Sequence, residues 1–276
     1  MKRKLSYILL LIISLSSCGE YNKLLKSSDY ELKYEYAKKY FDQKKYSKAS
    51  TLLEELVPLY KGTGNAEESL YLLARSLFLS KDYLSSGQYF TTYYTTYPKG
   101  EYTELARFYA GQGYFFDSPE AKLDQGQTYK AMNELQLFLE YFPQSDKKEE
   151  VEKMLIDLQE KLAYKELLNA RLYYDLGDYM GDNNFRSAVI TAQNAIKEFP
   201  YSKLREDFYF LVLKSKYSEA TNSKEAVKAD RLRDVVDEYY NYKNEYPDGK
   251  HIKDATSMFK KASKMIKPDS EEDNEE

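Results

Sequence analysis

Four short phrases, each an aromatic residue followed by proline, divide the chain at similar intervals. They are YPKG (97–100), FPQS (142–145), FPYS (199–202) and YPDG (246–249), and their prolines are 45, 57 and 47 residues apart. Proline lacks a backbone N–H and disfavours helix in the residue before it, so each phrase is expected to end a helix and start a turn. The repetition predicts an array of similar structural units.

The residues between these phrases have a helical hydrophobic period. Apolar residues recur at i, i+3, i+4, i+7 and i+8 from Leu70 to Phe78, and at i, i+3, i+4 and i+7 from Phe90 to Tyr97. The stretch SKDY (80–83) separates the two runs and predicts a tight turn between two helices. Each unit is therefore expected to be a helical hairpin that a proline closes.

The pattern of small, aromatic and proline residues is typical of tetratricopeptide repeats. The third and fourth units carry insertions in their turns, DSPEAKLDQGQ (117–127) and GDYMGDNN (177–184). The fifth unit replaces small residues with larger ones, and its turn (218–230) is predicted to be long and polar. The predicted fold class is all-α, an α-solenoid of about five tetratricopeptide-like hairpins with a C-terminal capping helix at about residues 252–266.

One predicted helix is much longer than the others. Residues 146–175 contain neither glycine nor proline, and a single helix of this length would measure about 45 Å. The expected organisation is a signal peptide (1–17), a lipidated linker (18–28), repeats one to three (29–145), the long helix with repeats four and five and the cap (146–266), and an acidic disordered tail (267–276).

The first residues have the pattern of an export signal. A basic stretch (2–4) precedes an apolar run (5–15) of about 11 residues, which is shorter than the roughly 20 that cross a bilayer. The sequence LSSC (15–18) resembles a bacterial lipobox, in which the cysteine is acylated and becomes the first residue of the mature chain. Cys18 is the only cysteine, so we expect a lipid anchor at Cys18 and no disulfide. The alternative is a signal peptide with an incidental cysteine.

Net charge argues against nucleic acid as a partner. Without residues 1–17, Lys plus Arg falls from 41 to 38 against 45 Asp plus Glu, and six of those acids lie in the last eight residues. The body of the chain is therefore nearly neutral and lacks the basic surface that nucleic-acid binding requires.

Residue types that carry catalysis are scarce. The single histidine, His251, supports neither a histidine metal pair nor a catalytic triad, and we interpret it as a surface residue after a turn. With Cys18 acylated, no thiol remains for a nucleophile or a zinc site. The Asp and Asn residues of 178–184 lack the spacing of a twelve-residue calcium loop and predict a polar turn. We expect no catalytic residues, no metal and no cofactor.

Together these features resemble one family. The lipobox at Cys18, the five hairpins, the DSPEA insertion (117–121) and the long helix through KLAYKELLNARLYYDLGDY (161–179) resemble the BamD family, lipoproteins of the outer-membrane β-barrel assembly machinery. The resemblance covers the mature chain to about residue 266, and the fifth repeat and the acidic tail depart from the family pattern.

The resemblance implies a non-enzymatic assembly factor, lipid-anchored on the periplasmic side of the outer membrane. It implies that the C-terminal repeats bind a BamA-like, barrel-forming subunit, together with other assembly lipoproteins. It also implies that the N-terminal repeats receive C-terminal segments of unfolded outer-membrane proteins.

Stacked hairpins leave a concave surface lined by their first helices, which suits an extended peptide. By repeat offset, six residues are candidates for this groove: Tyr34, Lys38, Phe41, Tyr71, Arg75 and Phe78. The aromatic rings suit the aromatic end of a barrel strand, and Lys38 or Arg75 suits its carboxylate. The alternative is that these residues only pack between hairpins.

Two other functional classes remain open from the sequence. A helical-repeat lipoprotein for nutrient or glycan uptake would usually expose tryptophan platforms, and the chain has no tryptophan. A peptidoglycan-cleaving enzyme would need a catalytic domain, for which the repeats leave no room. A different periplasmic protein–protein scaffold would share the same repeats.

Overall fold

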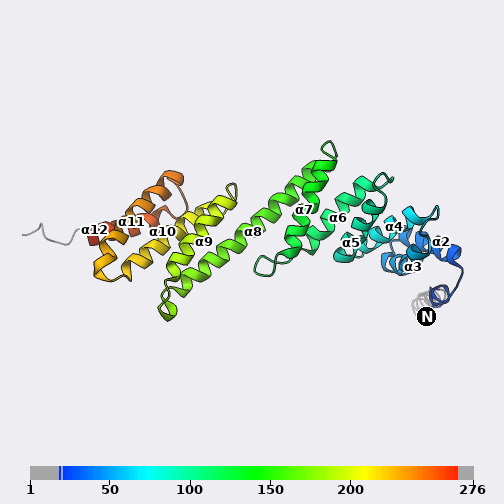
Figure 1. Ribbon diagram of the computed structural model, residues 1–276, viewed down its shortest axis with the longest axis horizontal. Helices are drawn as coiled ribbons and strands as arrows, with labels where there is room; N and C mark the ends of the chain where they lie inside the picture. The colour runs from blue at the N-terminus through cyan, green and yellow to red at the C-terminus, as the bar shows by residue number, and fades with distance from the viewer. Residues whose placement is uncertain (1–18, 20, 267–276) are drawn as a thin grey trace, which may run out of the picture. The chain divides into compact units, whose positions relative to one another are not determined.

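The computed structural model describes Gly19 and residues 21–266. Cys18, the predicted signal peptide (1–17) and the predicted acidic tail (267–276) lie outside the described residues, so they stay predictions. Within the described part, every regular element is a helix, and within each unit neighbouring helices pack against each other (Figure 1). The predicted all-α repeat fold is therefore confirmed. None of the described helices combines the length and the apolar character needed to span a bilayer.

The chain divides into two compact units. Unit 1 comprises Met1–Pro119 and Gly126–Leu155, and unit 2 comprises Glu120–Gln125 and Ile156–Glu276. The helices of unit 1 are α2 (Tyr30–Asp42), α3 (Tyr46–Leu59), α4 (Ala66–Leu79), α5 (Tyr83–Thr96), α6 (Thr103–Asp117), α7 (Gly126–Tyr141) and the beginning of α8. They form the hairpins α2–α3, α4–α5 and α6–α7.

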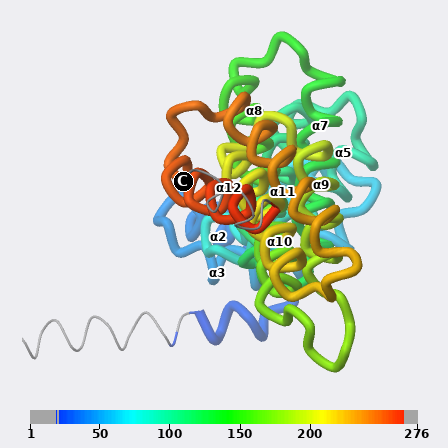
Figure 2. Tube along the Cα trace, turned by 90° about the vertical axis from the view of Figure 1, so that its left-hand side faces the viewer, coloured from blue at the N-terminus to red at the C-terminus, as the bar shows by residue number. Residues whose placement is uncertain are grey.

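Unit 2 is built in the same way. Helix α8 spans Lys148–Leu176, and its part from Ile156 onward belongs to unit 2. The other elements of unit 2 are the 3₁₀ turn η1 (Tyr179–Gly181), α9 (Asn184–Glu198), α10 (Arg205–Thr221), α11 (Glu225–Glu245) and α12 (Ile252–Ile266). Figure 2 shows α10, α11 and α12 side by side, with α12 as the last helix of the stack. The predicted long turn at 218–230 is wrong, because α10 continues to Thr221 and α11 begins at Glu225. The polar residues there are helix residues.

Small residues let the two helices of a hairpin approach closely. Ala74 on α4 and Ser86 on α5 are fully buried, and the Ser86 hydroxyl donates to the Ala74 carbonyl oxygen at 3.0 Å. The turn between these helices places Lys81 at a φ of 69° and then Asp82, whose carboxylate accepts from the Ser85 N–H at 3.2 Å. Asp82 therefore caps α5 and fixes where the second helix starts.

A glutamate on the first helix of four hairpins holds the turn that follows the second helix, and we call this contact the turn clasp. In α4–α5, the Glu67 carboxylate accepts from the Tyr93 hydroxyl and, at 2.8 Å, from the Glu101 N–H. In α10–α11, Glu206 accepts from the Tyr242 hydroxyl at 2.8 Å and from the His251 N–H at 3.1 Å. The clasp thus provides a hydrogen-bond acceptor for a backbone N–H of the turn that begins at the proline.

The other two hairpins with a clasp use serine instead of tyrosine. In α6–α7, the Ser145 hydroxyl donates to Glu104 at 2.6 Å. In α8–α9, the Ser202 hydroxyl and the Lys203 N–H both donate to Glu160 at 2.9 Å. The clasp explains why the aromatic-proline phrases end in either glycine or serine: a serine supplies the hydroxyl itself, whereas a tyrosine hydroxyl occupies the space that a side chain would need.

Candidate functional site

The six residues predicted for the groove lie on α2 and α4, the first helices of two neighbouring hairpins in unit 1. On α2, Tyr34 is buried, and its hydroxyl donates to the Glu68 carboxylate at 2.6 Å. Burial and this acidic partner raise the pKa of Tyr34 well above its usual value. The Lys38 ammonium lies 4.5 Å from the Tyr34 ring centroid and 3.8 Å from Glu68. Glu68 of α4 therefore connects the two hairpins.

Tyr71 of α4 stacks on Tyr102, the residue before the first helix of the next hairpin. The Tyr71 and Tyr102 ring centroids are 4.2 Å apart with an interplanar angle of 15°. Burial raises the pKa of Tyr71 to about 12, although the nearby Arg75 guanidinium lowers it. Tyr71 is therefore a neutral, partly buried ring at physiological pH.

Arg75 is the least satisfied charged residue of this surface. Its guanidinium carbon lies 4.0 Å from the Tyr109 ring centroid and 5.5 Å from that of Phe78. Its Nη1 atom is buried and has no hydrogen-bond partner among the described residues. No carboxylate of the described chain lies within ion-pair distance of Arg75, so a cation with a buried, unpaired donor is held between aromatic rings.

The remaining two candidates, Phe78 and Phe41, pack against neighbouring rings. Phe78 lies 5.2 Å from Tyr109 and 6.1 Å from Phe116 in ring centroids. Phe41 makes its ring contact with Tyr46 of its own hairpin, at 5.6 Å. Whether the six residues bind a ligand stays a prediction.

Sequence reasoning missed three rings that complete this surface. Tyr102, Tyr109 and Phe116 are spaced seven residues apart, so they lie on one side of α6 and the residue before it. This spacing is visible in the sequence, but the repeat offset was applied only to the first two hairpins. We call the surface made by these residues the aromatic–cationic face, and its members are Tyr34, Lys38, Phe41, Tyr71, Arg75, Phe78, Tyr102, Tyr109 and Phe116.

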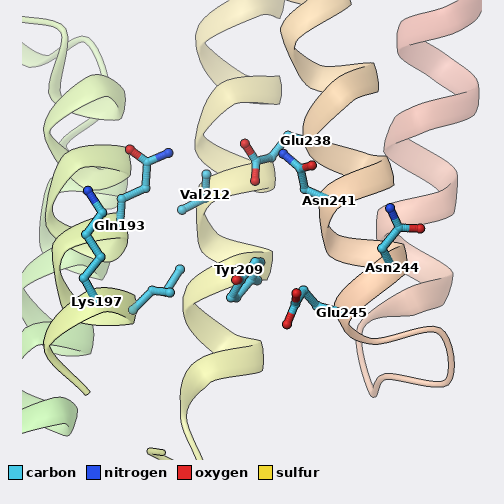
Figure 3. Close-up of a pocket in the computed structure, with 9 residues that line it drawn as sticks. Gln193, Lys197, Tyr209, Val212, Glu238, Asn241, Asn244 and Glu245 are labelled. Atoms are coloured by element: carbon cyan, nitrogen blue, oxygen red, sulfur yellow. The ribbon is translucent and has the colours of Figure 1, made fainter. Parts of the chain in front are cut away.

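A pocket of about 450 Å³ lies in unit 2 between α9, α10 and α11 (Figure 3). Its two carboxylates already have partners, since Glu238 pairs with Lys216 at 2.5 Å and Glu245 with Arg205 at 3.6 Å. The other polar groups include neutral amides, and its lining is Gln193, Ile196, Lys197, Tyr209, Val212, Glu238, Asn241, Asn244 and Glu245. These groups can hydrogen-bond a ligand but do not form a nucleophile with an adjacent base.

A second pocket of unit 2, of about 200 Å³, lies between α8, α10 and the residue before α12. Its lining is Arg171, Tyr174, Asp175, Asp207, Phe210, Leu211, Lys214 and His251. His251 follows the turn as expected and is partly exposed, at 25% of its side chain, and in addition it stacks on Phe210 and lies 3.2 Å from an Asp207 oxygen. We call this pocket the unit 2 cation pocket.

The comparison with protein families identifies the chain. A family model described as outer membrane lipoprotein, YfiO, matches residues 27–181. The chain belongs to the YfiO family. This is the BamD family of the sequence analysis, so the resemblance is confirmed, and the protein is a non-catalytic outer membrane lipoprotein. The matched range ends in the turn after α8, and a search of curated proteins finds no match.

Proposed function

We propose that this protein is an assembly factor for outer-membrane β-barrel proteins, held by lipid on Cys18 at the periplasmic side of the outer membrane. In this proposal, its aromatic–cationic face binds the C-terminal segment of an unfolded outer-membrane protein. The C-terminal repeats bind a BamA-like, barrel-forming subunit and other assembly lipoproteins. Membership of the YfiO family supports the assembly context.

The single observation that carries the peptide site is the state of Arg75. No carboxylate of the described residues pairs with Arg75, and one of its guanidinium nitrogens is buried without a hydrogen-bond partner, so its charge is not neutralised within the described chain. A carboxylate is the preferred partner of arginine because it accepts two parallel hydrogen bonds. The rings of Phe78 and Tyr109 flank the guanidinium, so an aromatic residue beside a terminal carboxylate matches the surface in both charge and shape.

The experiment for the peptide site measures binding of a synthetic peptide of about ten residues with the alternating pattern of a barrel strand. The peptide ends in phenylalanine with a free carboxylate. We expect the double variant Arg75→Glu/Phe78→Ala to weaken binding at the aromatic–cationic face at least about a hundredfold, because it removes an aromatic contact and repels the carboxylate. The control Lys99→Glu changes an exposed lysine in the turn after α5 and should bind as the wild type does.

Two measurements separate loss of binding from loss of structure. Both variants should keep the helicity and the unfolding temperature of the wild type within a few degrees. Unchanged affinity of the double variant would show that the peptide binds elsewhere or not at all.

The proposed partners are tested by affinity purification of the lipidated chain from detergent-solubilised membranes. We expect a large β-barrel protein with periplasmic repeats to copurify. Its reproducible absence would contradict the assembly role and favour the uptake or scaffold alternatives.

A further inference from the structure

We propose that the unit 2 cation pocket is a second binding site for an extended peptide that ends in an aromatic residue with a free carboxylate. The proposal rests on the proposed function of the aromatic–cationic face, because it assigns the same ligand class to a second place. It is carried by a correspondence between the two units that is visible residue by residue.

The correspondence begins at the turn clasps. Glu67 and Glu206 hold equivalent turns, and from each glutamate the same steps along the helix lead to an aromatic residue and then to a cation. Four residues after Glu206 is Phe210, as Tyr71 is four residues after Glu67. Four residues further is a cation in both helices, Lys214 on α10 and Arg75 on α4.

The aromatic stacking is also the same. His251 follows the turn glycine of YPDG by two residues, as Tyr102 follows the glycine of YPKG by two residues. Phe210 stacks on His251 with ring centroids 4.3 Å apart and an interplanar angle of 9°. The Tyr71–Tyr102 stack has nearly the same geometry, at 4.2 Å and 15°. Both units therefore present a flat pair of rings beside the cation.

The cation of the pocket is available to a ligand. The Lys214 ammonium lies 4.1 Å from the ring centroid of Tyr174 on the preceding hairpin, whereas the Arg75 guanidinium lies over Tyr109 on the following hairpin. The ring under the cation therefore comes from a different side in the two units. Among the described residues, no carboxylate forms an ion pair with Lys214. A lysine held over an aromatic ring without a carboxylate partner matches an incoming anion.

Asp207 holds the other positive groups in place. It accepts from Lys250 at 2.7 Å and lies 3.2 Å from the His251 ring nitrogen, and Arg171 is 3.8 Å away. Burial alone would raise the pKa of Asp207, but the hydrogen bonds from Lys250 and His251 outweigh it and lower the pKa. Asp207 is therefore an anion that positions its neighbours. The remaining carboxylate, Asp175, is exposed at the edge.

The size of the pocket limits the ligand. A volume of about 200 Å³ is smaller than the roughly 300–1,000 Å³ of typical cofactor pockets. This volume is about that of one residue. Charge and size together favour the end of a peptide chain.

The test counts binding sites by isothermal titration calorimetry. The full chain is titrated with the peptide that ends in phenylalanine with a free carboxylate. We expect two peptides per wild-type chain, one per chain for Lys214→Glu and one per chain for Arg75→Glu. A chain that carries both Lys214→Glu and Arg75→Glu should bind none. At each changed site the affinity should fall about 10- to 100-fold or more, as expected for loss of a charge-assisted contact.

Matched variants guard against misfolding. Lys260→Glu changes an exposed lysine of α12 that does not line the pocket, and it should keep two sites. Lys214→Gln removes the charge without adding an acid and should also leave one site. Both are compared with wild type in helicity and unfolding temperature.

The outcomes distinguish the two proposals. One peptide per wild-type chain, lost in Arg75→Glu and unchanged in Lys214→Glu, overturns the second site and leaves the proposed function intact. Binding that is lost in Lys214→Glu and unchanged in Arg75→Glu supports the pocket but contradicts the role of the aromatic–cationic face. No binding to the wild type contradicts both.

Discussion

Hairpin α4–α5 of unit 1 and hairpin α10–α11 of unit 2 share their turn clasp but differ in the charges beside it. The shared part is a glutamate, a tyrosine and a glycine: Glu67, Tyr93 and Gly100 in the first hairpin, and Glu206, Tyr242 and Gly249 in the second. The two hairpins differ in the two residues that come directly after the glycine. Unit 1 has Glu101 and Tyr102 there, whereas unit 2 has Lys250 and His251, both of which contact Asp207.

The difference separates residues that hold the fold from residues that we propose to face a ligand. The clasp residues are fixed by close contacts, so a change at one of them requires a change at another. The residues after the clasp only have to present rings and charge, and they differ between the units. The clasp is therefore expected to be sensitive to changes at its glycine and at its tyrosine.

The largest effect is expected from a methyl group at either clasp glycine. A Cβ on Gly249 would lie 2.5 Å from a Glu206 oxygen and 2.7 Å from the Tyr242 hydroxyl, and one on Gly100 would meet Glu67 and Tyr93 in the same way. Neither glycine has a positive φ, so space rather than backbone conformation requires it. We expect Gly100→Ala and Gly249→Ala each to lower the free energy of unfolding by about 1–3 kcal/mol in urea titrations.

A matched control exists in the turn before α4. A Cβ on Gly64 would meet no atom within 4 Å, and its φ is not positive. Gly64→Ala should therefore change stability by less than about 0.5 kcal/mol. Equal losses at Gly64 and Gly100 would show that the clasp glycines are not required by space.

A smaller effect is expected from exchanging one form of the clasp for the other. The hairpin α6–α7 has Phe138 and Ser145 where α4–α5 has Tyr93 and Gly100, each five residues before and two after the proline. The single changes Tyr93→Phe and Gly100→Ser should each destabilise, the first by loss of a hydrogen bond to a carboxylate and the second by crowding. The double variant should be more stable than the sum of the single losses predicts, by about 1–2 kcal/mol.

A double-mutant cycle in urea measures this coupling. Additive losses would mean that the serine hydroxyl does not replace the tyrosine hydroxyl, and that the two forms of the clasp are not equivalent.

The sequence predicted the hairpins because the signals are local. Helical periodicity, the turn SKDY (80–83) and the aromatic-proline phrases all act within about one helix length. The turn at 218–230 was predicted too long because polar residues on the exposed side of a helix resemble a loop in composition. The fifth unit departs from the repeat pattern because larger residues replace small ones, and one of these larger residues, Tyr242, is a clasp residue.

The site was predicted only in part because its completion depends on distant residues. The repeat offset pointed to Tyr71 and Arg75, but not to Tyr102 or Tyr109, which reach them from the next hairpin. Periodicity within one helix carries no information on which ring of the following hairpin will stack on it. The missing partner of Arg75 is likewise a property of the packed structure.

A peptide with a free or an amidated C-terminus tests whether Arg75 recognises a terminal carboxylate. The affinity of one peptide with a free C-terminus and of the same peptide with a C-terminal amide is measured for wild type and Arg75→Gln, both carrying Lys214→Gln so that only the aromatic–cationic face is compared. We predict that amidation weakens binding to the Arg75 protein at least about tenfold and hardly affects binding to Arg75→Gln. An equal loss on amidation in both proteins would contradict the account.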